Sequence, residues 1–278
     1  MLFTLVSIEW VSEGVFVGIL IRTMSVWASR RKATYIGSFL AIIAALAAVP
    51  IYQAFQVEPT CFDGKQNQGE LGVDCGGPCS LLCDFQVGSL QVLWSRSFPV
   101  TDRYYNAVAY IENPNLDAGV LEVPYLFQLY DAQNVLVTER RGRTFISNTA
   151  ITPIFEPRIE VGNRTPVRTF FRFEGSMPWR SLTRLREVTI EDQRVLRADS
   201  EPRLEATIRN ATLEDVRNIE VVAVVFNTAG NAIAVSQTAV PLLEQQSTET
   251  IFFVWPQPFS EPVGRIDIIP RIPPTEQL

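Results

Sequence analysis

The chain has 278 residues, of which 47% are apolar and 19% are charged, and its formal net charge is −6. It contains no histidine, which excludes Ser-His-Asp and Cys-His nucleophile pairs and HExxH zinc sites. The acidic balance argues against nucleic acid as a partner, because binding phosphate backbones needs a basic face. The apolar content is enough for packed cores and is unlike that of a disordered chain.

An uncharged stretch over residues 33–57 is as long as a membrane span. About 20 helical residues cross the hydrocarbon layer, so this stretch predicts a transmembrane signal anchor. Arg30, Arg31 and Lys32 precede it, and Glu58 is the first charge after it. The positive-inside rule then keeps the N-terminal side in the cytoplasm and exports the residues beyond the span. The alternatives are a cleaved signal peptide, whose apolar region is usually shorter, and a buried core helix.

Residues 1–32 are expected to be a cytoplasmic or interfacial segment or an additional hydrophobic helix. Residues 2–21 are mostly apolar but include Glu9 and Glu13, and a carboxylate at membrane depth is costly. Three interpretations stay open: an interfacial helix, a first span that forms a hairpin with the second, or an extension upstream of a start at Met24. All three export the rest of the chain.

The four cysteines, Cys61, Cys75, Cys79 and Cys83, lie in a module expected over residues 58–84. An even number in a short exported segment predicts two disulfides, because so small a module buries too little apolar surface to fold without covalent or metal staples. Four cysteines allow three pairings, and their spacing does not choose among them. Tetrathiolate zinc and a thioredoxin-type redox site are less favoured, because export favours oxidation and the spacing is CxxxC.

Four side chains with oxygen donors stand between the first two cysteines: Asp63, Asn67, Glu70 and Asp74. Calcium takes 6–8 oxygen ligands, and this density of donors makes calcium the candidate cofactor, although the spacing is not that of an EF-hand. The alternative is a disulfide-linked turn in which these side chains cap local backbone N–H groups.

The motif reads C-x-D-G-x-x-N-x-x-E-x-G-x-D-C-G-G-x-C from Cys61, and the fourth cysteine is Cys83. It resembles a short cysteine module found beside secretion signals and Ig-like domains in bacterial cell-surface proteins. The resemblance covers residues 61–83 and implies an exported bacterial protein. It supplies no function for the module itself.

Beyond the module, short runs of branched and aromatic residues separated by turn residues predict strands. Residues 107–113 align with 204–210, and residues 125–131 align with 221–227, so one pattern occurs twice about 100 residues apart. That period suits an Ig-type sandwich. The expected fold class is mainly β: two Ig-like antiparallel β-sandwich domains in tandem, preceded by an N-terminal transmembrane helix and a small disulfide-rich module.

The expected boundaries place the first sandwich at residues 85–175, a linker at 176–199, the second sandwich at 200–272 and a flexible tail at 273–278. Both copies resemble FxLYD and CARDB-type Ig-like domains and the related WHy domain. The residues that carry this resemblance are Asn113, Pro114, Leu129, Tyr130 and Asp131 in the first copy and Asn210, Phe226 and Asn227 in the second, which lacks the Pro and the Asp. The resemblance covers most of residues 85–272 and implies a binding or spacer role without catalysis.

Five arginines of the first sandwich form a candidate binding patch for an anionic surface polymer or an acidic partner domain: Arg140, Arg141, Arg143, Arg168 and Arg172. The alternative is a solvated face with scattered ion pairs, which contribute little to stability.

The predicted function is a non-catalytic, membrane-anchored extracytoplasmic protein that presents two Ig-like domains as a structural, adhesive or binding module. The alternative is an accessory subunit of an envelope secretion or pilus-type machine. The expected partners are the membrane and other envelope proteins or surface polymers, not nucleic acid. An envelope hydrolase would need paired carboxylates in a cleft, and no pair lies in a recognisable motif.

Overall fold

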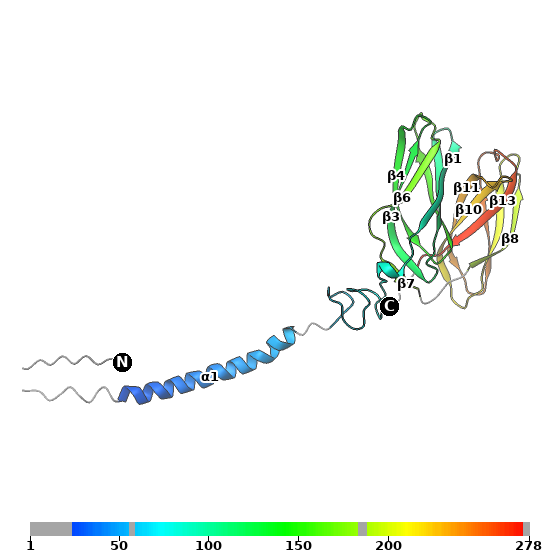
Figure 1. Cartoon of the computed structure of the whole chain (residues 1–278). Coiled ribbons are helices and arrows are strands. Elements are labelled where there is room, and N and C mark those ends of the chain that lie inside the picture. The colour runs from blue at the N-terminus through cyan, green and yellow to red at the C-terminus, as the bar shows by residue number, and fades with distance from the viewer. Residues whose placement is uncertain (1–23, 56–58, 183–187, 275–278) are drawn as a thin grey trace, which may run out of the picture. The chain divides into compact units, whose positions relative to one another are not determined.

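The computed structural model describes residues 24–55, 59–182 and 188–274 (Figure 1). The chain divides into two compact units, Met1–Pro59 and Thr60–Leu278. Residues 1–23 lie outside the described residues, so an interfacial helix or an additional span at the N-terminus stays a prediction.

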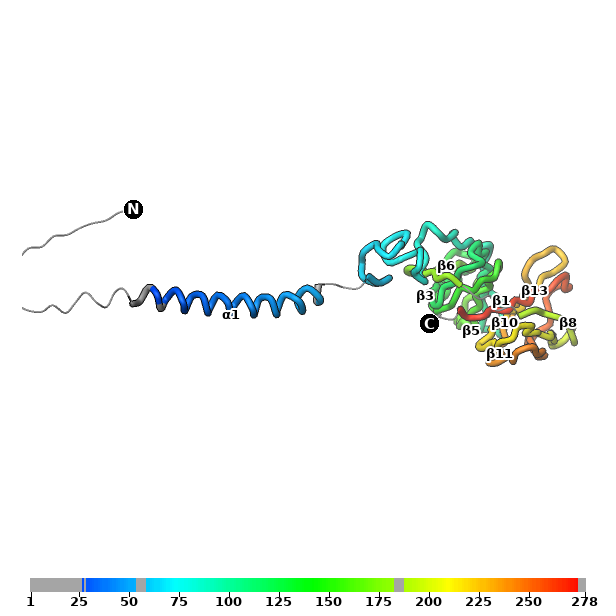
Figure 2. The backbone as a smooth tube through the Cα atoms, turned by 90° about the horizontal axis from the view of Figure 1, so that it is seen from below, coloured from blue at the N-terminus to red at the C-terminus, as the bar shows by residue number. Residues whose placement is uncertain are grey.

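The described part of the first unit is one helix, α1 (Met24–Phe55), which Figure 2 shows as a continuous coil. Its segment Ser29–Gln53 has a hydropathy of 2.0 and is 0% buried within the protein. Residues 33–55 of the uncharged stretch are therefore part of a longer helix that exposes apolar side chains on all sides, and residues 56–57 lie outside the described residues. Such a helix has the length and composition to cross a membrane, because the helix satisfies its own backbone hydrogen bonds.

The second unit begins with the cysteine module, which in the structure comprises residues 60–86 and ends in one short 3₁₀ helix, η1 (Asp84–Gln86). Two antiparallel sheets come next and form the first sandwich. One sheet has the order β1 (Gln91–Thr101), β2 (Tyr104–Glu112), β5 (Ile151–Glu160); the other has the order β4 (Leu136–Ile146), β3 (Ala118–Tyr130), β6 (Arg168–Phe173), and β7 (Trp179–Ser181) pairs with β3. Their facing side chains, among them Ile111 of β2 and Phe127 of β3, make the first hydrophobic core.

The second sandwich repeats this strand order. Its sheets are β8 (Val188–Leu196), β9 (Arg203–Asn210), β12 (Thr248–Val254), and β11 (Ala232–Leu243), β10 (Val216–Asn227), β13 (Val263–Arg271). The central strand β9 thus corresponds to β2, and β10 corresponds to β3, as the sequence alignment predicts. A separate core, with Ile208 and Phe253 among its members, lies between these two sheets. The mainly β, antiparallel sandwich fold with an N-terminal helix is confirmed.

The structure differs from the sequence expectation at residues 176–199, which were expected to link the sandwiches. That range contains β7, which pairs with β3, and β8, which pairs with β9. The strand β8 is an edge strand with a register shift between Ile190 and Asp192. Its charged outward positions and its irregular register conceal the alternation by which strands are recognised.

A third hydrophobic core, the joint core, connects the two sandwiches face to face. It combines Phe98, Val108 and Tyr110 of the β1-β2-β5 sheet with side chains such as Val224 and Phe226 of the β11-β10-β13 sheet. The central strands β2 and β10 are consequently buried on both faces, and their sequences lack a clear alternation for that reason. The sandwiches are layers of one body and not beads on a flexible linker.

The two copies use different faces for this contact. Val108 on β2 lies in the joint core, whereas the aligned residue on β9 is Glu205, which pairs with Arg194. Val224 on β10 also lies in the joint core, and the aligned residue on β3 is the half-buried Gln128. Each copy therefore has one apolar outer face that meets the other copy, and a second outer face with Gln128 or Glu205 on its central strand that does not.

Candidate functional site

The cysteine module is closed by two crossed disulfides. Cys61 bonds to Cys79, and Cys75 bonds to Cys83. The expectation of two disulfides is confirmed, and the structure selects one of the three pairings that the spacing left open. Tetrathiolate zinc needs thiolates that this pairing consumes, and neither disulfide joins the two cysteines of a CxxxC pair.

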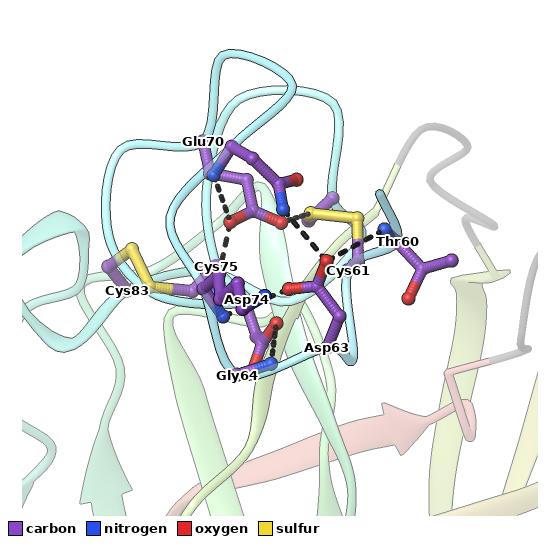
Figure 3. Close-up of a disulfide and its surroundings, with 11 residues drawn as sticks. Thr60, Cys61, Asp63, Gly64, Glu70, Asp74, Cys75 and Cys83 are labelled. Atoms are coloured by element: carbon purple, nitrogen blue, oxygen red, sulfur yellow. Dashed lines mark hydrogen bonds between the residues drawn. A yellow bond between two sulfur atoms is a disulfide. The ribbon is translucent and has the colours of Figure 1, made fainter. Parts of the chain in front are cut away.

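Two carboxylates at the module's edge fold back onto its own backbone (Figure 3). Asp63 accepts hydrogen bonds from the amide side chain of Asn67 at 2.8 Å and from the backbone N–H of Lys65 at 2.9 Å. Both oxygens of Asp74 accept the N–H of Gly64, at 3.0 and 3.1 Å. The hydrogen bond from the Asn67 side chain is the main cause that lowers the pKa of Asp63 below its ordinary value.

Glu70 lies at the centre of the module and is 6% exposed. Its Oε2 accepts the backbone N–H groups of Asn67 and Asp74, each at 3.2 Å, while Oε1 lies 3.2 Å from Sγ of Cys79. That sulfur belongs to a disulfide and has no proton to donate. The two N–H donors offset the cost of burying a carboxylate, so Glu70 organises the loop around it.

Among the described residues, the three candidate carboxylates Asp63, Glu70 and Asp74 do not form a group with ligand atoms within 4.8 Å of one another. In the described part of the chain, one group of three potential metal-ligating side chains lies within 4.8 Å of one another, Cys61, Glu70 and Cys79, and its two sulfurs are bonded to each other. Of the four candidate oxygen donors, Asn67 contributes a buried Oδ1 without a hydrogen-bond partner. One such oxygen is far from the 6–8 that calcium takes. The contacts favour the capping interpretation, and calcium binding stays a prediction.

The module is joined to the first sandwich through backbone pairing. The N–H of Leu82 donates to the carbonyl of Trp179 at 2.8 Å, and the N–H of Ser181 donates to the carbonyl of Ser80 at 3.0 Å. The module thereby forms an isolated antiparallel β-bridge, Leu81 with Arg180, to the strand β7 that also pairs with β3. The module and the sandwich are consequently one rigid piece at this end of the sheet.

The two signature asparagines have the same structural role in both copies. Asn113 is 2% exposed and Asn210 is 0% exposed, and each accepts the backbone N–H two residues further on, at 2.9 and 3.0 Å. Their side-chain N–H groups donate to carbonyls just beyond or at the end of a strand of the opposite sheet, Ser147 at 2.9 Å and Leu243 at 3.2 Å. Each asparagine therefore ties the two sheets of its sandwich together.

The second part of the signature forms turns and core. Oδ1 of Asp131 accepts the N–H of Val135 at 2.9 Å, and Oδ1 of Asn227 accepts the N–H of Asn231 at 2.7 Å, so both close the hairpin after the central strand. The remaining members lie at four other places: Leu129 in the first core, Phe226 in the joint core, Tyr130 against the ring of Phe170, and Pro114 against Gly88. The signature is thus used for folding.

The five arginines of the candidate binding patch lie on β4 and β6, on either side of β3. Four of them pair with carboxylates and the fifth with an amide: Arg140 with Glu156, Arg141 with Glu139, Arg143 with Glu122, Arg172 with Glu174, and Arg168 with Asn134. These partners neutralise most of the positive charge, which favours a solvated face with ion pairs. Binding of an anionic polymer at this patch stays a prediction.

A buried arginine connects the sandwiches and was missed by sequence reasoning. Arg271, on β13, is 2% exposed and donates to Glu220 at 2.6 Å within the second sandwich. It also donates to the hydroxyl of Thr144 at 2.6 Å and to the carbonyl of Phe145 at 3.0 Å, both in the first sandwich. Burial lowers the pKa of Arg271. A single arginine in a Pro-rich C-terminal segment carries no sequence signal for this role.

One more buried polar cluster lies in the first core. The hydroxyl of Tyr125 donates to Glu156, whose other oxygen accepts Nε of Arg140 at 2.8 Å. Burial is the main cause that raises the pKa of Tyr125, and the hydrogen bond to Glu156 adds to it. By the strand registers, Glu156 occupies the position that Phe253 has in the second sandwich. The cluster is one carboxylate held by two donors, unlike the paired carboxylates of a glycoside hydrolase.

Comparisons with known proteins add little. No family model and no curated protein matches the chain. Sixty-six chains of solved structures do match. One is a β-glucuronidase from glycoside hydrolase family 2, with 9% sequence identity and a TM-score of 0.20, covering 61% of this chain and 24% of that enzyme. The chain therefore spans about a quarter of that protein's length, and a likeness this weak carries no argument.

Proposed function

We propose that the protein is a non-catalytic, membrane-anchored extracytoplasmic protein, in which α1 crosses the membrane once and the β unit acts outside as a structural or binding module. The observation that carries this proposal is the division of the chain into an apolar helix, whose span is 0% buried, and a separate β unit with its own disulfides and cores. A core helix of a soluble protein would be covered by the rest of the chain.

Charge and redox chemistry support the orientation. Arg30, Arg31 and Lys32 lie in the N-terminal part of α1, where the positive-inside rule places the cytoplasm. The disulfides lie after the helix, and disulfides persist in oxidising compartments. Both arguments support an outer position for the β unit.

The β unit supports a binding or structural role through its rigidity. The joint core, the Arg271 contacts and the pairing of the cysteine module with β7 fix the two sandwiches and the module relative to one another. A partner would therefore meet polar faces and loops at a fixed spacing, and binding loses little conformational entropy when the surface is preorganised.

The orientation can be tested on cells that express the full chain with a C-terminal tag. Added protease should remove the β unit from spheroplasts while a cytoplasmic marker stays intact. A maleimide reagent should label Cys61, Cys75, Cys79 and Cys83 only after reduction. Replacing Arg30, Arg31 and Lys32 by glutamate removes the orientation signal and should reduce the fraction of the β unit that protease can reach. Protection of the β unit in spheroplasts, or labelling without reductant, would overturn the proposal.

A further inference from the structure

The cysteine module exposes four large apolar side chains. Phe62 is 81% exposed, Phe85 72%, Val73 57% and Leu71 53%. They lie in a segment of fewer than thirty residues, among exposed polar side chains such as Gln66 and Gln68. Exposed apolar patches of this kind mark sites that contact a membrane or another protein.

Backbone contacts bring the loops that carry these residues together. The N–H of Gly64 bonds to the carboxylate of Asp74, which brings the loop of Phe62 beside that of Val73. A Cβ at Gly76 would lie 2.8 Å from both Cβ of Leu71 and Oε1 of Gln86, so the loop of Leu71 also adjoins η1, which contains Phe85.

Most carboxylates of the module are held by its own backbone. Of its four carboxylates after Pro59, three accept backbone N–H groups of the module itself, namely those of Asp63, Glu70 and Asp74. Lys65 is exposed, and it is the one lysine beyond α1 in the sequence. The carboxylates of the module outnumber Lys65, so the exposed apolar side chains, and not charge, would provide its contact with a lipid layer.

The short segment between α1 and the cysteine module keeps the module close to the membrane. Five residues separate the end of α1 at Phe55 from Cys61, and five extended residues span at most about 18 Å. The headgroup region extends about 5–8 Å beyond the hydrocarbon on each side, so a module on so short a tether stays within reach of it. Aromatic side chains prefer this interface.

Resting on the proposed membrane anchor, we infer that Phe62, Leu71, Val73 and Phe85 form a lipid-contacting surface that seats the cysteine module in the outer headgroup layer. The module then connects the two sandwiches to the membrane surface. Its disulfides keep the apolar side chains outward, because the interior is filled by sulfur and by the carboxylate of Glu70.

The test places a tryptophan reporter on the full chain in nanodiscs of phosphatidylcholine and phosphatidylglycerol. Trp10 and Trp27 are first replaced by phenylalanine to lower the background. The reporter variant is Val73→Trp, and the matched control is Val167→Trp, because both valines are 57% exposed. Val167 bonds to the carbonyl of Tyr130 at the far end of β3 from the module.

Brominated lipids should quench the added emission of Val73→Trp and leave that of Val167→Trp unchanged, and the emission of Val73→Trp should also shift to the blue. Phe62→Trp provides a second reporter in case Val73→Trp fails to form both disulfides, which thiol titration detects. Quenching of neither reporter, in chains that co-elute with nanodiscs, would overturn the lipid contact while the anchor stands. Equal quenching of Val73→Trp and Val167→Trp would overturn a contact specific to the module. Failure of the chain to enter nanodiscs would overturn the anchor and this inference together.

Discussion

Replacing Val224 by glutamine should weaken the contact between the two sandwiches. Val224 is 0% exposed on β10 and lies in the joint core with Tyr110 and Phe226. Losing the buried valine side chain removes about 1.5–3 kcal/mol of stabilisation. Burying an amide without hydrogen-bond partners costs roughly another 1–3 kcal/mol. The free energy of unfolding should therefore fall by about 3 kcal/mol or more.

The repeat provides the matched control. Gln128 occupies the equivalent position on β3, on the polar outer face, so Gln128→Val should change the free energy of unfolding by no more than about 0.5 kcal/mol. Guanidinium denaturation of residues 60–278, monitored by tryptophan fluorescence and circular dichroism, measures both variants. The parent unit should unfold in one transition, and Val224→Gln should broaden or split it. A loss below about 1 kcal/mol, or equal losses in the two variants, would refute the contact between the sandwiches.

Three further predictions concern buried polar groups and the module. Arg271→Ala should lower the free energy of unfolding by about 3 kcal/mol. Arg217→Ala, on the adjacent strand and with a side chain 63% exposed, should change it by no more than about 0.5 kcal/mol. Equal losses in the two variants on denaturation would contradict the role of Arg271 in connecting the sandwiches. Asn210→Asp should cost about 3 kcal/mol or more by calorimetry, because a carboxylate would face the three carbonyls that now accept the amide; a neutral outcome would contradict that geometry. Asn67→Ala should raise the pKa of Asp63 toward its ordinary value in a carbon NMR titration. Since that pKa is lowered by folding, the stabilisation from Asp63 is present above the ordinary pKa and is lost as the pH falls through the folded value; an unchanged titration would show that Asn67 is not the cause.

The sequence predicted those features that depend on local pattern. The apolar run of α1, the two disulfides and the alignment of Asn113 with Asn210 all depend on residue type and spacing within short windows. The asparagines could be aligned because each occupies the same buried position at the end of a central strand, where no other side chain makes all the hydrogen bonds.

Features that depend on packing between distant segments could not be predicted in this way. The doubly buried β2 and β10 have apolar runs without alternation, which indicates burial but not the partner. The charged edge strand β8 has the composition of a linker, and Arg271 lies in a segment with the composition of a frayed tail. The carboxylates of Asp63, Glu70 and Asp74 accept backbone N–H groups of their own loop, contacts that composition does not reveal, and calcium binding stays a prediction.

The unequal faces of the two copies have a consequence for assembly. A contact between non-equivalent surfaces has no built-in stopping point, and repeated addition of copies through such contacts produces open filaments. Here Glu205 at one end of the stack and Gln128 at the other stand where the joint core has Val108 and Val224. Polar residues at these two positions disfavour the addition of further copies. Apolar substitutions there would favour open association of the β unit into a fibre.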